Sequence, residues 1–293
     1  PMDTIRYDLK TLNRQFQLAS KQKTATANNL IALQEQSFPG IRKCFDSPVR
    51  QDGTQKWVDF TYTFWHADCV RKHSLNAFAE RYRKWCKRHG YIFKQSNAEE
   101  VYALAKSAVT LVSSSEVTKL LVQEAANQLT GISHSVETYR AEMNRLASML
   151  PEYPVVMEMY GVGESFGPQL MAEIGDIRRF EHKKSLVAFA GVDPMPNQSG
   201  EKNVRSNRSS KRGSPYLRKT LFNIMGIYLR CSPADEPVYQ FLDRKRVEGK
   251  PFYISAGANK FLRRYYAKVR DYLATLDGLP PVDMDSTGLS QPD

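Results

Sequence analysis

The sequence lacks several features that would assign it to common protein classes. No apolar stretch approaches the roughly 18 residues of a membrane-spanning helix, and the first ten residues, PMDTIRYDLK, contain no apolar signal-peptide core. The four cysteines, Cys44, Cys69, Cys86 and Cys231, are scattered without a disulfide-like spacing. These absences favour a reducing, cytoplasmic setting over a secreted or membrane location.

Acidic residues are scarce relative to basic ones. The 293 residues include 42 Lys and Arg against 31 Asp and Glu, which gives a formal net charge of +11 and a pI of about 9.4. A basic excess of this size favours a polyanionic partner, with nucleic acid ahead of a membrane surface.

Two long amphipathic helices are predicted in the first half of the chain by apolar residues at three- and four-residue spacing. The first covers residues 5–37, is weakened at Lys23 and Thr26, and stops at Pro39. The second opens at residues 113–116 and ends at Pro151 and Pro154. Its coiled-coil seam is Val122, Ala125, Leu129, Ile132, Val136, Tyr139, Met143, Leu146 and Leu150. The seams suit a hairpin within one chain and also a homodimer or higher oligomer.

Residues 41–95 form an insertion that combines aromatic and basic side chains. The aromatic residues are Trp57, Phe60, Tyr62, Phe64 and Trp65, and a predicted helix over 69–89 adds Arg71, Lys72, Arg81, Arg83, Lys84, Lys87 and Arg88. Interleaved aromatic and basic residues can stack bases and hold phosphates. An aromatic core beneath a solvated basic helix gives the same pattern, and we favour it because most aromatic residues are buried.

Several histidine and cysteine residues lie close enough in the sequence to suggest a zinc site. His66, Cys69 and His73 fall on one helical face, and Cys86 precedes His89 by three residues. This spacing fits no common zinc module, so no metal site is predicted. A capping-box pattern at residues 96–99 predicts a further helix over 98–112.

The second half of the chain predicts a series of shorter helices. Gly161 and Gly163 frame a tight turn before a helix over 164–174, in a helix-hairpin-helix pattern whose backbone amides suit a phosphate. A plain connection between helices is the alternative. Further helices are predicted over 184–190, 234–248 and 257–276, and another is capped by Ser214 and begins at Pro215. The proline-containing tail after Gly278 is predicted to be disordered. The expected fold is mainly α, with a small loop or β-hairpin around residue 199.

Candidate chemistry gathers in residues 197–221, NQSGEKNVRSNRSSKRGSPYLRKTL. A glycine-flanked turn presents Ser199, and the segment has one acid, Glu201. The basic residues that follow are Lys202, Arg205, Arg208, Lys211, Arg212, Arg218 and Lys219. Such a hydroxyl suits attack on a phosphodiester, because the cations stabilise charge that builds on the phosphate oxygens. A basic loop that only binds phosphate has the same composition and is the commoner case.

Three ordered pieces of the second half resemble a known family. They read MYGVGESFGPQLMAEIGDIRRF, LVAFAGVDPMPNQSG and SKRGSPYLRKTLF, and they fall within residues 150–275. Together they resemble the C-terminal transposase domain of the DEDD-type insertion-sequence transposases, bacterial recombinases of which some are guided by a bridge RNA. Residues 1–150 look like the family's helical connector. The resemblance implies a connector over 1–150 with the insertion at 41–95, a transposase domain over 151–277 and a tail over 278–293.

The resemblance also implies an activity. Ser199 would be the nucleophile of DNA transposition and form a covalent phosphoserine link, while Gly161, Gly163 and the basic residues above would bind nucleic acid. His182, the nearest histidine to Ser199, is expected at the surface.

The chain departs from the family pattern in one respect. Family members hold a divalent metal, Mg²⁺, with four acidic residues of a RuvC-like domain, and no such domain precedes Ile5. No cofactor is therefore expected in this chain, and Pro1, inside a helical pattern, suggests a piece of a longer protein. DNA and a guide RNA are the expected partners. A remnant that binds nucleic acid without chemistry is the alternative function.

Overall fold

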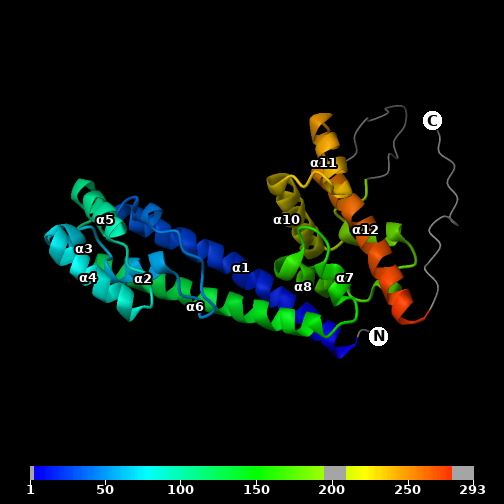
Figure 1. The fold of residues 1–293 in the computed structure, drawn as a ribbon, viewed down its shortest axis with the longest axis horizontal. Helices are drawn as coiled ribbons and strands as arrows, with labels where there is room; N and C mark the ends of the chain where they lie inside the picture. Colours follow the sequence, from blue (N-terminus) through cyan, green and yellow to red (C-terminus); the bar gives the residue numbers. More distant parts are fainter. Residues whose placement is uncertain (1–2, 195–208, 279–293) are drawn as a thin grey trace. The chain divides into compact units, whose positions relative to one another are not determined.

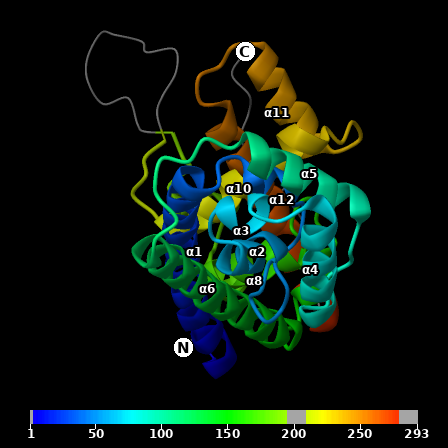
Figure 2. The same ribbon diagram turned by 90° about the vertical axis from the view of Figure 1, so that its left-hand side faces the viewer.

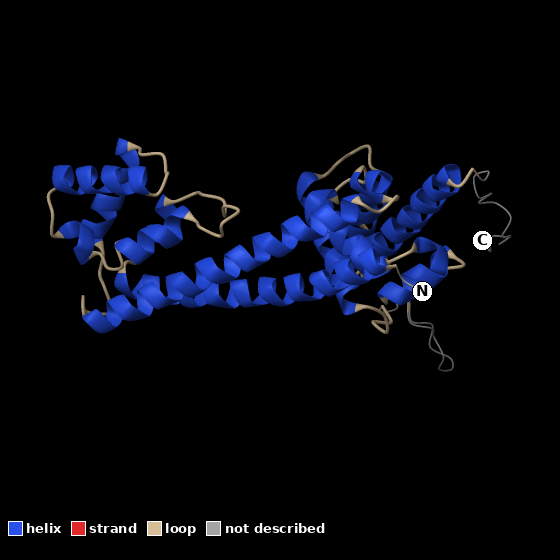
Figure 3. Cartoon of the chain, turned by 90° about the horizontal axis from the view of Figure 1, so that it is seen from below, coloured by secondary structure: helices blue, strands red, loops and turns tan. Residues whose placement is uncertain are grey.

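The computed structural model describes residues 3–194 and 209–278, and in these residues the regular secondary structure consists of helices (Figure 3). The mainly α prediction is confirmed. The chain divides into two compact units, one made of Pro1–Arg14 with Ala141–Asp293 and the other of Gln15–Arg140. We call them the split unit and the middle unit. The predicted tail lies outside the described residues, and the domain boundary at residue 150 stays a prediction.

Two long helices pair within the middle unit. They are α1 (Thr4–Ser37) and α6 (Glu116–Ser148). Lys23 Nζ lies 3.9 Å from Glu137 Oε1, while Leu30, seven residues later on α1, shares a core cluster with Val122 and Leu129. The order of these contacts makes the helices antiparallel (Figure 1). The two apolar stripes therefore meet inside one chain, which is the hairpin that the sequence allowed.

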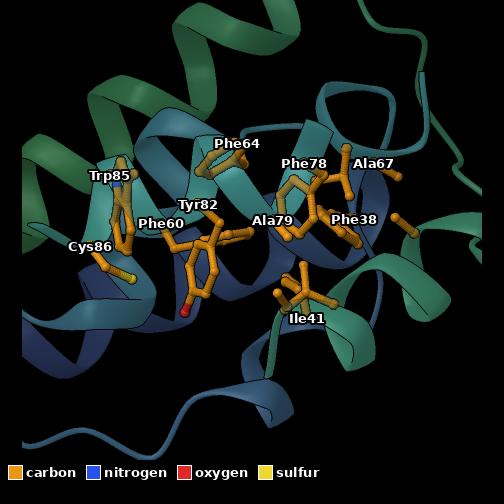
Figure 4. Packing of buried hydrophobic residues seen from close by; sticks show 14 residues of the cluster. Phe38, Ile41, Phe60, Phe64, Ala67, Phe78, Ala79, Tyr82, Trp85 and Cys86 are labelled. Carbon is orange, nitrogen blue, oxygen red and sulfur yellow. The ribbon is translucent and has the colours of Figure 1, made fainter. Parts of the chain in front are cut away.

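Aromatic residues of the insertion form the second core of the middle unit. The helices that build this core are η1 (Ile41–Cys44), α2 (Lys56–Thr63), α3 (Asp68–Arg71), α4 (Leu75–Arg88) and α5 (Gln95–Ser107), with α5 beside α3 and α4 in Figures 1 and 2. Phe60 is fully buried and stacks on Phe64 with 4.6 Å between ring centroids, and Trp85 meets Phe60 edge-on at 5.8 Å (Figure 4). The aromatic core is thus the correct interpretation for Phe60, Phe64 and Trp85, whose buried rings have no face open to a base, whereas Tyr62 is 41% exposed.

Two helix boundaries in the insertion differ from the prediction. The basic helix over 69–89 is two helices, because Ser74 Oγ accepts a hydrogen bond from the Ala77 amide and starts α4 anew. The capping box at Ser96 is wrong, since α5 begins one residue earlier, at Gln95. The Asn97 side chain serves tertiary structure instead: its Oδ1 accepts from Tyr82 Oη at 2.6 Å and its Nδ2 donates to the Cys44 carbonyl at 2.7 Å.

The histidines considered for zinc have other partners. His66 is buried, its Nε2 lies 3.1 Å from the Val112 carbonyl oxygen, and its Nδ1 accepts from the Asp68 amide. His73 Nε2 lies 2.9 Å from an Arg81 guanidinium nitrogen. Across residues 3–194 and 209–278, no three or more His, Cys, Asp or Glu side chains are placed to hold a metal ion.

The split unit is built from the remaining helices. They are α7 (Tyr153–Met157), α8 (Gly163–Ile174), η2 (Ile177–Arg179), α9 (Lys183–Ala190), α10 (Pro215–Cys231), α11 (Pro237–Val247) and α12 (Tyr253–Leu276). In its interior α10 packs on α8, and α12 contacts α7, α9, α10 and α11. The apolar stripe predicted for α10 is buried at Leu217, Leu221 and Ile224. None of the described helices combines the length and apolar content needed to cross a bilayer.

The start of α12 corrects the prediction of a helix from Gly257. The helix begins at Tyr253, and Gly257 lies inside it. A Cβ at Gly257 would come 2.6 Å from Leu242 Cδ1, so the missing side chain allows α11 and α12 to approach closely. The glycine marks a helix contact here and not a helix end.

The first turns of α1 are anchored within the split unit by a buried ion pair. Arg6 donates from both terminal nitrogens to the Glu152 carboxylate, with 2.9 Å between Nη2 and Oε2. Burial disfavours the guanidinium charge, but the hydrogen bond and charge of Glu152 outweigh it and raise the pKa of Arg6. Both side chains are almost inaccessible to solvent, so each depends on the other for compensation of its charge.

Candidate nucleic-acid interface

The segment that carries Ser199 enters and leaves the described structure at one place. Pro194 and Ser209 form an isolated antiparallel bridge. The Ser210 amide donates to the Asp193 carbonyl at 2.9 Å, and Ser210 Oγ donates to Asp193 Oδ1 at 2.5 Å. The Lys211 amide donates to the Gly191 carbonyl at 3.1 Å. We call residues 191–194 and 209–214 the loop base.

Two glycines let the two segments of the loop base lie close to α9. Gly191 ends α9 with φ +67°, a left-handed conformation that few side chains tolerate. A Cβ at Gly213 would lie 2.0 Å from the Phe189 carbonyl oxygen, so only glycine fits. The next amide, of Ser214, donates to that same carbonyl at 2.7 Å. Backbone contact between the two glycine-containing pieces of the sequence therefore fixes the loop base.

A buried carboxylate on α8 holds the end of the loop base. Glu173 is 1% exposed and accepts from Asn13 Nδ2 at 2.7 Å, from Arg14 Nη2 at 3.0 Å and from Ser214 Oγ at 3.0 Å. Ser214 Oγ also accepts from the Leu217 amide, as the predicted cap of α10. Ser214, the last residue of the loop base, is thus bonded to α8, α9 and α10. The sequence did not reveal the contacts of Glu173, because Asn13 and Ser214 lie 160 and 41 positions away from it.

The predicted phosphate-binding residues divide into three groups. Those that lie outside the described residues are Ser199, Lys202, Arg205 and Arg208. Lys211, Arg212 and Lys219 are exposed at or beside the loop base. Arg218 is half-buried and donates to the Ala190 carbonyl at 3.2 Å, where it satisfies the C-terminal end of α9. His182 is exposed, as expected.

The turn at Gly161 and Gly163 has the predicted backbone. Both glycines have positive φ, +74° and +47°, and the turn joins α7 to α8. It lies at the opposite end of α8 from Glu173, a separation of about 15 Å at 1.5 Å per helical residue. The turn and the loop base are therefore separate places in the split unit, which sequence order did not reveal. The phosphate-binding role of the turn stays a prediction.

A cavity beside the loop base was not predicted. Its volume is about 480 Å³, and it is lined by Val192, Pro194, Ser209, Phe241, Phe252, Ser255, Ala256, Asn259, Lys260 and Arg263. Ser255, Asn259 and Arg263 are four residues apart and so share one face of α12. The sequence assigns Asn259 and Arg263 only to a helix predicted over 257–276. The four-residue spacing of polar residues was the signal that could have located the cavity wall.

Comparison with known proteins gives this geometry a family context. Residues 153–240 match the family model of the IS116/IS110/IS902 transposases. The match runs from α7 into α11 and contains the turn, Glu173, the loop base and Ser199. Residues 153–240 of the chain are therefore similar to insertion-sequence transposases.

Individual relatives agree with the family model. A 42 kDa protein of insertion element IS900 from Mycobacterium paratuberculosis is 24% identical over 61% of this chain and 46% of its own length. The pilin gene-inverting protein of Moraxella bovis is 32% identical over 44% of this chain and 38% of its own length. The IS1111A transposase of Coxiella burnetii is 31% identical over 33% and 26%. The chain thus spans less than half the length of each of these relatives.

Proposed function

We propose that this chain acts in DNA transposition or recombination as part of a serine-nucleophile transposase. The observation that carries the proposal is the match of residues 153–240 to a transposase family, across the segment where the fold joins the two ends of the Ser199-containing loop. The exposed Lys211, Arg212 and Lys219 and the net charge of +11 support DNA as the partner.

The proposed reaction is a transesterification at phosphorus. Ser199 Oγ loses its proton and attacks a DNA phosphodiester, and a P–Oγ bond forms. The bond from phosphorus to one sugar oxygen breaks, and that oxygen takes up a proton and leaves as a DNA hydroxyl. The basic residues near the loop base stabilise the charge on the non-bridging oxygens. The phosphoserine retains the energy of the ester bond, so a new DNA hydroxyl can later displace the serine and rejoin strands.

The metal of the resembled family has no fitting site in the described part of this chain. Its acidic ligands belong to a RuvC-like domain, and residues 3–194 and 209–278 bring no three candidate ligands together. Consequently no step of the proposed reaction uses a metal held by the described residues.

A covalent-adduct experiment tests the nucleophile. The chain, supplemented with a full-length relative, is incubated with DNA that contains candidate element ends, with and without a guide RNA. Denaturing electrophoresis and peptide mapping then look for DNA attached to Ser199. We expect an adduct with the parent chain and with Ser206→Ala, and none with Ser199→Ala. An adduct of equal yield in Ser199→Ala would refute the assignment.

A second function, binding of nucleic acid without chemistry, is favoured by the exposed basic residues Lys211, Arg212 and Lys219 at or beside the loop base. It predicts salt-sensitive DNA binding with no adduct under any of these conditions. A third candidate, a purely structural helical protein, predicts no steep dependence of binding on salt.

We also propose that the outer face of α6 supports a homodimer. Val117, Leu120 and Leu121 are 66%, 58% and 51% exposed and lie at helical spacing on one side of α6. Light scattering after gel filtration should give a dimeric mass for the parent and a monomeric mass for Leu120→Glu. Equal masses would argue against this face.

A further inference from the structure

The cavity beside the loop base has the composition of a nucleotide site. Its apolar wall includes the rings of Phe241 and Phe252, which are half-buried and so keep part of their surface accessible. Its volume of about 480 Å³ lies in the range of cavities that accept small organic molecules. Nothing in the assigned roles of Ser199 or the loop base uses this space.

The charged part of the lining is entirely basic. No Asp or Glu is among the lining residues. Lys260 Nζ lies 5.9 Å from the centroid of the Phe241 ring and has no ion-pair partner within the described residues. Arg263 donates from Nε to Asn259 Oδ1 at 2.8 Å, which fixes the guanidinium while its two terminal nitrogens have no partner in the described part of the chain. Those nitrogens can take a phosphate in bidentate fashion.

The aromatic and basic groups come from α11 and α12, which meet at the cavity. Phe241 lies on α11, while Lys260 and Arg263 lie on α12, and Phe252 immediately precedes α12. Aromatic surface next to cations is the combination by which proteins hold single-stranded nucleic acid. The cavity also reaches Pro194 and Ser209, the two residues of the bridge that closes the loop base.

We propose that this cavity holds one unstacked nucleotide of the DNA strand engaged at the loop base. Its base packs on Phe241 and Phe252, and its phosphate lies on Lys260 and Arg263. The proposal rests on the proposed function in that DNA is the partner. Holding one base of this strand in the cavity, out of the base stack, fixes the register of the strand at the loop base and leaves the strand's backbone accessible.

Photocrosslinking and binding measurements test the cavity directly. A 12-nucleotide single strand with one 5-iodouracil is irradiated with the chain, and we expect crosslinked peptides to contain Phe241 or Phe252. Fluorescence anisotropy at fixed salt then compares variants. Phe252→Ala should weaken binding about 5- to 50-fold, as for other base–aromatic stacks, and Phe252→Trp should restore it. Arg263→Ala should also weaken binding and reduce the salt slope by about one.

Matched controls separate the cavity from general charge and aromatic content. Lys268→Ala removes another exposed cation of α12, and Phe222→Ala removes an exposed ring of α10. Both should bind the strand with less than a twofold change. A 12-mer with an abasic site at every position should bind the parent as weakly as the intact strand binds Phe252→Ala. If Phe252→Ala is misfolded by circular dichroism, the abasic strand and Phe252→Leu provide the same test.

The outcomes distinguish this proposal from the proposed function. Equal affinity for intact and abasic strands, with binding still salt-sensitive, would reject the nucleotide site and leave DNA binding in place. Absence of binding to any DNA would reject both. Free thymidine monophosphate that competes at the same concentration as the 12-mer would reject a strand-bound ligand in favour of a mononucleotide.

Discussion

Glu173 offers the sharpest test of how the loop base is held. Its carboxylate is 1% exposed and accepts three hydrogen bonds, from Asn13, Arg14 and Ser214. We predict that Glu173→Ala destabilises the split unit strongly, because it removes all three acceptor contacts and leaves the donors in a site closed to solvent. Loss of one partner of a buried pair typically costs about 3–5 kcal/mol. Arg14 is 34% exposed and regains some hydration in the variant, so we expect the free energy of unfolding to fall by about 3–4 kcal/mol.

The isosteric variant separates charge from shape. Glu173→Gln keeps one acceptor oxygen, and the Asn13 amide can rotate so that its Oδ1, which has no hydrogen-bond partner, accepts from the new amide. The hydrogen bonds to the charged carboxylate become neutral hydrogen bonds, each contributing about 1 kcal/mol to stability. We therefore expect the free energy of unfolding to fall by about 2 kcal/mol. For a unit of this size the melting temperature should fall by about 4–8 °C for the Gln variant and roughly twice that for the Ala variant.

Far-UV circular dichroism and tryptophan fluorescence measure the effect. The three tryptophans, Trp57, Trp65 and Trp85, all lie in the middle unit, whereas the helical signal comes from both units. We expect the substitutions at Glu173 to shift the circular dichroism transition in urea and heat. Glu142→Ala, which removes an exposed carboxylate paired with Arg145 on the same unit, should leave the transition unchanged. A Glu173→Ala chain within 1 kcal/mol of the parent would refute the reasoning.

Three further outcomes follow from the packing. Gly213→Ala should cost more than about 3 kcal/mol in urea unfolding, because its Cβ would meet a backbone carbonyl oxygen of α9 at 2.0 Å, whereas Gly226→Ala, with open space around it, should gain about 0.5–1 kcal/mol. At pH 8 a disulfide reagent should modify the exposed Cys231 before Cys44. Burial raises the pKa of Cys44 to about 12, so its thiolate fraction is roughly a thousandth of that of a thiol with pKa 9 and rises tenfold per pH unit. Equal modification rates of the two cysteines, measured by peptide mapping, would contradict this. Phe60→Ala should lower the free energy of unfolding by about 3–5 kcal/mol, whereas Tyr62→Ala, at an exposed ring, should lower it by under about 1 kcal/mol. Equal losses would speak against an aromatic core.

Local patterns predicted the long helices well. The steps of three and four residues along α6 place Val122, Leu129 and Val136 on one buried face, and this periodicity is a property of neighbouring residues alone. Ser214 as the cap of α10 and Gly191 at the end of α9 were predictable for the same reason, since each acts on the adjoining turn.

Features that depend on distant residues were not predictable from one sequence. Ser96 matched a capping box, yet α5 starts earlier and Asn97 instead bonds with Tyr82 and the Cys44 carbonyl. The spacing of Phe60 and Phe64 is helical, but their partners on α4 come from folding of the insertion. The cavity needs α11, α12 and the loop base together, and no local pattern brings these segments to one place.

The first fourteen residues have a consequence for any attempt to isolate the transposase-like half of the chain. Arg6 neutralises Glu152, and Asn13 and Arg14 bond to Glu173, although more than 140 positions separate them. A polypeptide that started at Ala141 would contain two inward-facing carboxylates with their basic partners removed. We therefore expect such a fragment to fold only when a peptide of residues 1–14 is supplied in trans or joined to it.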